Sequence, residues 1–448
     1  VILERSKVAD DLLHTASRLL ARVRGGLGYA VVIVGALLAA STGIVGATVI
    51  TMTLIALPTM LRQGYDPRLA TGTIAASGTL GQIIPPSIVL ILLADAVSNA
   101  NQSAAMRSGG GAGVVSVGDL FAGALLPGLL LVSLYLLYLM MTAILRPSAS
   151  PAVVLEEEAE PLTLTEIARS LGAPLLLIIA VLGSILGGLA SPTEASAIGA
   201  GGALLLAGLR LAPEHGRTGD LGSIWGAFIS LILLGLMTNT LDLTVTRDGL
   251  GTFDYLAIGL AGFASLVFLG GLLSAARVLI RASQFSSALT AGAQITSMVF
   301  LILIGASLFA LVFRAYGGEH YVEALLTSIP GGLWGALAIT MLVMFILGFF
   351  LDFIEIVFVV VPIVAPPLII LGADPVWLAI LMALNLQTSF LTPPFGFALF
   401  YLRGAAPDGV ETMDIWRGAI PFIGLQMVMI ALVAAIPALA TWLPAFVR

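Results

Sequence analysis

Long apolar stretches separated by short polar segments make up almost the whole chain. A run of about 20 apolar residues is enough to cross a bilayer as a helix, and the apolar stretches suffice for about ten crossings or hairpins. Two of these stretches are interrupted by Gly, Pro and hydroxyl side chains, at residues 78–87 and 386–395. The pattern predicts an all-α polytopic membrane protein in which two helices are broken at mid-membrane.

The first interruption is Gly78-Thr79-Leu80-Gly81-Gln82-Ile83-Ile84-Pro85-Pro86-Ser87. Two consecutive prolines remove two backbone donors, so a continuous α-helix over 67–97 is not expected. Unpaired carbonyls at membrane depth are tolerated only where protein buries them or where they line a cavity. The interruption therefore predicts a binding site, and residues 374–402 repeat the pattern around Pro393-Pro394.

Each broken helix follows a segment that resembles a helical hairpin. Residues 27–61 carry a polar kernel at 40–48, and each flank is too short to span about 30 Å alone. This favours a re-entrant hairpin, although one long helix with small residues for close packing would give a similar pattern. Residues 333–371 repeat the arrangement around a kernel at 348–355.

Residues 58–86 align with residues 366–394 at a fixed offset of 308 residues without a gap. Pro is about 5% of average protein sequence, so four coincident prolines are not expected by chance. The halves predict an internal repeat, with residues 26–146 as the first copy and 319–448 as the second. The matching pairs are Pro58 and Pro366, Gly64 and Gly372, Asp66 and Asp374, Pro67 and Pro375, Ala75 and Ala383, and Pro85-Pro86 and Pro393-Pro394.

Loop charges predict that the two copies have opposite orientations in the membrane. The loop at 61–68 carries Arg62 and Arg68, whereas the equivalent loop at 369–376 has no cation. The second broken helix is followed by Arg403 and Arg417, but the first only by Arg107. Basic loops are cytoplasmic by the positive-inside rule. Inverted repeats with paired hairpins and broken helices are the architecture of a secondary transporter.

The remaining segments connect or support these repeats. Residues 1–25 predict an interfacial or scaffold helix, with a solvated connector helix as the alternative, and the first residues read as the end of an apolar helix whose start is missing. We expect final spans of the repeats at 118–145 and 418–445, an acidic Pro- and Glu-rich linker at 147–171, and scaffold helices at 172–318.

Composition narrows the class of protein further. Hydrophobic residues make up 59% of the 448 and charged residues 10%, with a net charge of −6. The sequence has no cysteine, and its three histidines are scattered, so neither thiolate nor zinc sites are expected. It has no G-x-x-x-x-G-K-[ST] motif, which argues against ATP hydrolysis. We therefore predict a protein that is not an enzyme and has no cofactor, no transition metal and no nucleic-acid partner.

The motifs of the chain resemble those of a known family, the large membrane subunits of tripartite ATP-independent periplasmic (TRAP) transporters, also called DctM-like permeases. The resemblance covers almost the whole chain. The matching motifs are Gly64-Tyr65-Asp66-Pro67-Arg68, Gly78-Thr79-Leu80-Gly81 with Ile84-Pro85-Pro86-Ser87, Leu120-Phe121-Ala122-Gly123 to Pro127-Gly128, Pro192-Thr193-Glu194-Ala195, and Leu391-Thr392-Pro393-Pro394-Phe395-Gly396.

The resemblance implies sodium-driven uptake of an organic acid across the bacterial inner membrane by an elevator movement. It implies a mobile transport domain with the hairpins and broken helices, and a static scaffold shared with a small membrane subunit. It also implies a periplasmic binding protein that delivers the substrate. The chain departs from the family in lacking its first scaffold helices, in an insertion at about 212–283, and in a less Ser-rich tip at 41–43.

Sodium prefers oxygen ligands, and a hairpin tip facing an unwound helix offers carbonyls and hydroxyls together. The alternative for any single Ser or Thr is a hydrogen bond to a carbonyl of its own helix. The expected sodium ligands are Ser41, Thr42, Gly43, Gly78 and Thr79 in the first half and Gly348, Asp352, Asn385, Thr388 and Thr392 in the second.

Asp352 is the expected ligand with a charge. An acid inside an apolar hairpin is costly and usually functional. Glu355, three residues later, would share its helix face. Asp352 would bind sodium or pair with a buried cation, or would be merely solvated if it lies at the membrane surface.

We expect the half-helix starts after the prolines to direct positive dipole ends at a substrate carboxylate. The corresponding helix-break or substrate-facing residues are Pro85, Pro86, Ser87, Pro393, Pro394 and Gly396.

A binding-protein-independent sodium/dicarboxylate carrier would share these hairpins and broken helices and remains the alternative. An intramembrane enzyme would need facing aspartates or a Ser–His pair, and neither is evident. A passive channel would not need two broken helices around ion-sized kernels.

Overall fold

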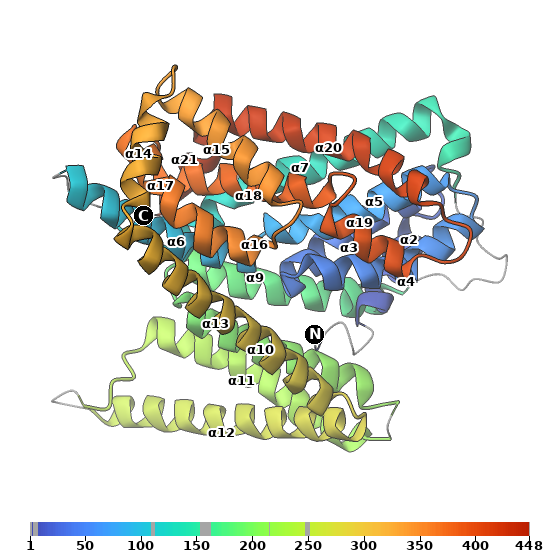
Figure 1. Cartoon of the computed structure of the whole chain (residues 1–448). Helices are drawn as coiled ribbons and strands as arrows, with labels where there is room; N and C mark the ends of the chain where they lie inside the picture. Colours follow the sequence, from blue (N-terminus) through green and yellow to red (C-terminus); the bar gives the residue numbers. More distant parts are fainter. Residues whose placement is uncertain are drawn as a thin grey trace. The chain divides into compact units, whose positions relative to one another are not determined.

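Helices form all of the regular structure that the computed structural model describes, which covers residues 2, 8–108, 113–152, 163–214, 216–246 and 251–447 (Figure 1). Nine of the described helices are long and apolar enough to cross a membrane. The protein is therefore an all-α polytopic membrane protein, as the hydrophobic pattern predicts. Three of the predicted segments lie partly outside the described residues. These parts are residues 1 and 3–7 of the predicted first helix, residues 153–162 of the linker, and residues 215 and 247–250 of the insertion.

The chain divides into two compact units, one of residues 1–11 and 168–295 and the other of residues 12–167 and 296–448. The smaller unit contains α9 (Ala173–Leu186), α10 (Pro192–Leu211), α11 (Leu221–Thr240) and α12 (Thr252–Arg281). Small residues bring its helices together, since a methyl group at Gly271 would lie 2.3 Å from the Ala227 Cβ.

The larger unit contains both interrupted helices and both hairpins (Figure 1). Its first half has α3 (Gly26–Thr42), α4 (Val45–Arg62), α5 (Pro67–Thr79), the 3₁₀ turn η1 (Leu80–Gln82), α6 (Ile88–Ser108) and α7 (Val117–Leu145). Its second half has α14 (Gly318–Ser328), α15 (Leu333–Leu347), α16 (Phe353–Glu355), the π-helical η5 (Ile356–Val360), α17 (Val361–Ile370), α18 (Pro375–Leu391), α19 (Phe397–Ala405), α20 (Thr412–Ala435) and α21 (Ala438–Val447).

Two long helices contribute residues to both units: α2 (Val8–Leu20) and α13 (Phe285–Ala315). The remaining helical pieces are η2 (Pro147–Ala149), α8 (Leu164–Ile167), η3 (Ala168–Gly172) and η4 (Thr218–Asp220).

Both interrupted helices begin with the same local chemistry. Asp66 caps α5 by accepting a hydrogen bond from the Arg68 amide at 2.9 Å, and Asp374 caps α18 by accepting one from the Trp377 amide at 2.9 Å. Each aspartate precedes a proline at the first helical position, where the missing N–H leaves no intrahelical bond unmade. Asp-Pro therefore fixes the start of both helices.

The turn between α3 and α4 depends on Gly43. This residue has a left-handed backbone with φ of 62°, and its amide donates to the carbonyl of Ala39 at the end of α3. Glycine adopts this conformation without the Cβ penalty that other residues carry. In the second half the turn covers residues 348–352, and the Asp352 carboxylate caps the short helix α16.

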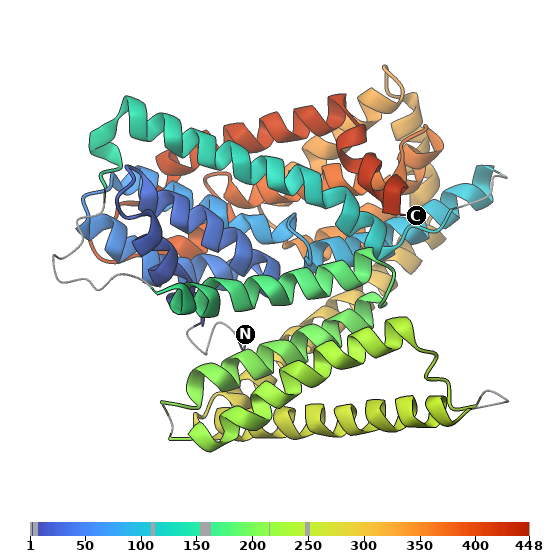
Figure 2. The same ribbon diagram turned by 180° about the vertical axis from the view of Figure 1, so that it is seen from behind.

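The two halves exchange contacts reciprocally. Helix α5 packs on α20 and α18 packs on α7; likewise α4 packs on α19 and α17 packs on α6. Figure 2 shows α7, in teal, beside α20 from behind. In a two-fold arrangement each half presents the same surface to the other half, so each contact from the first half to the second is matched by an equivalent contact from the second half to the first.

Individual glycines reproduce this exchange. A methyl group at Gly418 in α20 would lie 2.1 Å from the Arg68 carbonyl oxygen, and one at Gly72 would lie 2.0 Å from the Gly418 oxygen. In the other direction, a methyl group at Gly123 in α7 would lie 2.9 Å from Val376 Cγ1 and 3.5 Å from Ile380 Cγ1. Val376 and Ile380 are 308 residues after Arg68 and Gly72.

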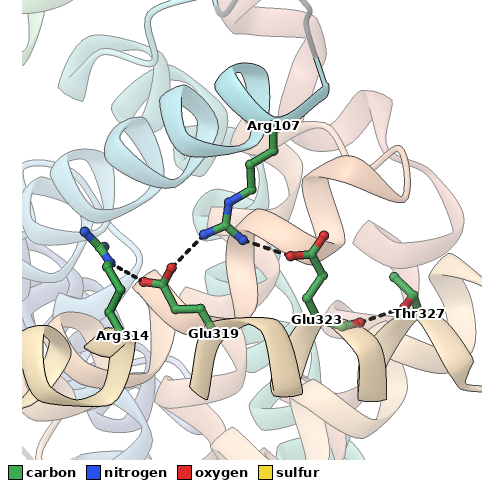
Figure 3. Close-up of polar contacts among 5 residues, drawn as sticks. All are labelled: Arg107, Arg314, Glu319, Glu323 and Thr327. Atoms are coloured by element: carbon green, nitrogen blue, oxygen red, sulfur yellow. Dashed lines mark hydrogen bonds and ion pairs between the residues drawn. The ribbon is translucent and has the colours of Figure 1, made fainter. Parts of the chain in front are cut away.

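An ion cluster ties α6 to α14 (Figure 3). Arg107 near the end of α6 donates to Glu319 at 2.6 Å and to Glu323 at 2.9 Å. Arg314 also donates to Glu319, at 2.9 Å. The two acids lie four residues apart on α14, so both face the same guanidinium.

Candidate functional site

The C-terminal parts of α5 and α18, which precede the two interruptions, contact each other inside the larger unit. Gln387 in α18 donates from Nε2 to Oγ1 of Thr79, the last residue of α5, at 3.4 Å. Both side chains are fully buried. Helix α18 also packs on η1, which lies in the first interruption, and on α6, which follows it. Residues that are far apart in the sequence, from both halves, are thus brought to one place.

In the first half the helix stops after Thr79, and a short 3₁₀ turn ends at Gln82. Regular helix resumes at Ile88. The hydroxyl of Ser87 donates to the Gln82 carbonyl at 3.0 Å. Pro85 and Pro86 lie between the two helices and are joined by a cis peptide bond.

The first hairpin turn packs directly against this interruption. A methyl group at Gly43 would lie 3.1 Å from Cγ1 of Ile88, the first residue of α6, and one at Gly78 would lie 2.2 Å from Cγ2 of Val49 in α4. Gly43, Gly78 and Thr79 therefore lie where hairpin and broken helix meet. The side chains of Ser41 and Thr42 lie outside the part of the structure that is described.

In the second half α18 ends at Leu391 and α19 begins at Phe397. The Gly396 amide donates to the Thr392 carbonyl at 3.0 Å. Pro393 and Pro394 are again joined by a cis peptide bond. The hydroxyls of Thr388 and Thr392 donate to the carbonyls of Leu384 and Thr388, at 2.8 and 2.7 Å.

The second hairpin is attached to its broken helix by a side chain. Asn385 donates from Nδ2 to the Met341 carbonyl in α15 at 2.8 Å. A methyl group at Gly348 would lie 2.1 Å from the Ser389 hydroxyl. Asn385 and Gly348 thus lie on the contact between the second hairpin and α18, whereas Thr388 bonds within α18 and Thr392 follows at the interruption.

Asp352 lies in the second hairpin turn, where its Oδ1 accepts from the Phe353 amide at 2.7 Å. It is the N-cap residue of α16, and Glu355 is the third residue of that short helix. Among the described residues no Lys or Arg side chain forms an ion pair with Asp352. Glu355 Oε2 is buried without a hydrogen-bond partner in the same described part.

Four buried polar residues beside the interruptions are absent from the predicted ligand set. Gln426 in α20 donates from Nε2 to Thr79 Oγ1 at 3.3 Å and to the Tyr135 hydroxyl in α7 at 2.8 Å. Gln387 is the third of these residues, since it bonds the same Thr79 hydroxyl. Gln82 is the fourth, and its fully buried amide has two polar atoms that lack partners among the described residues. An isolated Gln within an apolar span is the sequence signal for Gln426.

Broken helices around buried polar groups, in an all-helical polytopic protein, define a membrane transporter as the class. The family described as "Tripartite ATP-independent periplasmic transporter, DctM component" matches residues 1–221 and again residues 219–439. The chain therefore belongs to the DctM family of TRAP transporter large permeases, which are transport proteins and not enzymes.

The chain is similar to named TRAP transporter permeases over almost its full length. It is 26% identical to the C4-dicarboxylate TRAP transporter large permease protein DctM of Vibrio cholerae, over 98% of this chain and 81% of the relative. It is 28% identical to the protein of the same name from Pseudomonas aeruginosa, over 98% and 82%. The ectoine TRAP transporter large permease TeaC of Halomonas elongata is 24% identical over 99% and 83%.

Proposed function

We propose that the protein carries out sodium-coupled uptake of an organic acid anion across the bacterial inner membrane. A periplasmic binding protein would deliver the substrate, and a small membrane subunit would complete the transporter. The observation that carries this proposal is the meeting of two interrupted helices, each packed against its hairpin turn, in a chain of the DctM family. This is where a secondary transporter places its ion and substrate sites.

Two sodium sites would lie at the two hairpin–helix contacts. Backbone carbonyls freed where the helices stop, together with nearby hydroxyls, supply the oxygen ligands that a hard cation prefers. Threonines whose protons bond to their own helix still offer lone pairs on the same oxygen. The proposed ligands remain Ser41, Thr42, Gly43, Gly78 and Thr79 at one site and Gly348, Asp352, Asn385, Thr388 and Thr392 at the other.

The substrate would bind between the same interruptions. Helices α6 and α19 both begin there, at Ile88 and Phe397, and their first amides carry the positive end of the helix dipole. An organic carboxylate fits that polarity, and similar permeases are named for C4-dicarboxylates. The residues proposed to face it are Pro85, Pro86, Ser87, Pro393, Pro394 and Gly396.

The reciprocal contacts between the halves support a pair of inverted repeats, residues 26–146 and 319–448. Since each hairpin packs on a broken helix, we propose that these elements move together as the transport domain of an elevator. The scaffold would contain residues 172–318, including the insertion at 212–283, and would bind the small subunit.

Reconstitution tests this function directly. The full permease with its small subunit is placed in liposomes, the binding protein is added, and uptake of a radiolabelled C4-dicarboxylate and related organic acids is followed. The proposal predicts uptake only with an inward sodium gradient and the binding protein together. A potassium gradient of equal size is the control.

Each other outcome decides against part of the proposal. Uptake that persists without the sodium gradient contradicts sodium coupling. Sodium-driven uptake that is unchanged without the binding protein identifies the alternative, a binding-protein-independent sodium/dicarboxylate carrier.

A further inference from the structure

Two equivalent residues of the repeat touch each other. Thr79 and Gln387 are 308 residues apart, which is the offset that aligns the two halves, and their side chains are 3.4 Å apart. In a two-fold arrangement a residue contacts its own counterpart only close to the axis. Thr79 and Gln387 therefore lie at the point where the two halves meet as equivalents.

The contact belongs to a hydrogen-bond network that links four helices. Thr79 Oγ1 donates its proton to the Ala76 carbonyl at 2.8 Å and accepts from both Gln387 and Gln426. Gln426 also donates to the Tyr135 hydroxyl. The network thus joins α5 and α18, which end at the two interruptions, to α7 of the first repeat and α20 of the second.

This network is not fully satisfied in the arrangement described. Oε1 of Gln387 and Oε1 of Gln426 are buried and have no partner in the described part of the chain. A buried acceptor without a partner destabilises the arrangement in which it occurs. A movement of either helix end that gives these oxygens a donor would remove that destabilisation.

Each end of the network is next to proposed sodium ligands. Thr79 is itself one of them and follows Gly78, while Gln387 precedes Thr388. A sodium ion that draws the end of α5 toward the first hairpin would shift Thr79 Oγ1, which accepts the hydrogen bonds from Gln387 and Gln426. The same holds in reverse for an ion that orders the end of α18.

We propose that Gln387, Gln426 and Tyr135 are positioning residues that couple the two interruptions, so that sodium at one hairpin turn raises the sodium affinity of the other. The inference rests on the two sodium sites proposed above. Coupling between sites is reciprocal, and values of about 5-fold and above are typical where a shared element has two arrangements.

Single-cysteine labelling measures each turn separately, because the sequence has no cysteine. Ile44→Cys places a fluorophore at the first turn and Phe350→Cys one at the second, where Phe350 is exposed. Each labelled permease, purified with its small subunit, is titrated with NaCl at constant ionic strength kept with choline chloride. Thr388→Val then weakens the second site while the Ile44→Cys label reports the first.

The expected result is a rise of about fivefold in the half-saturating sodium concentration at the first turn when Thr388→Val is introduced. In a Gln387→Met or Gln426→Met background the same substitution should change it less than about twofold, because a side chain of similar volume remains but the amide is gone. Thr73→Ala is the control background, in which the effect of Thr388→Val should persist, since Thr73 is equally buried and its hydroxyl bonds within α5, to the Leu69 carbonyl.

The outcomes separate this inference from the function on which it rests. If neither label responds to sodium in the unsubstituted protein, the proposed function is contradicted. If both respond but Thr388→Val leaves the first turn unchanged, or its effect persists in both Met backgrounds, the coupling is overturned while the two sodium sites stand. Two separate Met variants guard against one that fails to fold.

Discussion

The two interrupted helices share their backbone plan but use their polar side chains differently. At the first, Thr79 accepts hydrogen bonds from the other half of the molecule, from Gln387 and Gln426. At the second, the hydroxyls of Thr388 and Thr392 bond within their own chain segment. The two halves therefore stop their helices at similar positions but surround the two stops with different hydrogen-bond partners.

Equivalent positions show the same contrast. Asn385 is 308 residues after Ser77. Ser77 donates to the Thr73 carbonyl within α5 at 2.6 Å, but Asn385 reaches the Met341 carbonyl of the neighbouring hairpin at 2.8 Å. The second hairpin is thus fixed to its helix by a side chain, whereas the first hairpin relies on close packing around Gly78.

The largest expected effect comes from forcing apart α5 and α20, which pack closely across the two halves. Gly418→Ala places a methyl group 2.1 Å from the Arg68 carbonyl oxygen, so α5 and α20 must separate. Overpacking of this kind costs about 1–3 kcal/mol, or more where backbone atoms collide. We expect a large fall in the melting temperature of the purified protein. Gly424→Ala in the same helix meets nothing within 4 Å and is the control; equal melting temperatures would contradict this packing.

Substitution at the equivalent pair Asn385 and Ser77 should give the next largest effect. Asn385→Leu removes a hydrogen bond between two elements, α18 and α15, and should cost about 1–1.5 kcal/mol, while Ser77→Ala removes only a hydrogen bond within α5 and should cost less than about 0.5 kcal/mol. Chemical denaturation of the two variants in detergent measures the difference. Equal losses would show that the two halves hold their hairpins alike.

Asp352→Asn tests the charge in the second turn apart from its role as a helix cap. Asn caps helices about as well as Asp, so the fold should be kept. If the carboxylate binds sodium, its loss should raise the half-saturating sodium concentration for transport by roughly tenfold, equivalent to about 1.4 kcal/mol. Unaltered sodium dependence would leave Asp352 as a cap alone and remove it from the proposed ligands.

The smallest expected effect is that of Arg107→Gln. Its ion pairs with Glu319 and Glu323 tie α6 to α14, but the Arg107 side chain is 31% exposed. Exposed ion pairs contribute about 0–1 kcal/mol and weaken with salt. Thermal stability should fall slightly at low salt and match that of the unsubstituted protein at high salt. A loss that is the same at both salt concentrations would show that packing, not charge, holds α14.

The sequence predicts the features that depend on local chemistry. Asp-Pro starts a helix, so the starts at Pro67 and Pro375 were accessible from residue types. A proline pair alone does not give a gap, because Pro366-Pro367 lie inside α17. The gaps around Pro85-Pro86 and Pro393-Pro394 were accessible because Gly and hydroxyl side chains accompany the prolines there. The offset of 308 was accessible by counting. Asp352 shows that even a local feature can escape prediction from residue types, because its role as a helix cap depends on where the hairpin turn ends.

Features that depend on distant contacts could not be predicted. Gln426 looks like a single polar residue in an apolar span, and only the packing of α20 on α5 and α7 shows that it bonds Thr79 and Tyr135. Gln82 and Gln387 likewise gain significance from burial. The reciprocal exchange between the halves requires knowing which helix lies beside which, and the offset alone does not give that.

Equilibrium binding of ²²Na⁺ to the purified permease tests the central claim most directly, that each interrupted helix forms its own sodium site. The unsubstituted protein is compared with Thr79→Val, Thr388→Val and the double variant. The account predicts saturable binding, a partial loss in each single variant and a larger loss when the two are combined. Binding that is absent from the unsubstituted protein, or that remains complete in the double variant, would contradict it.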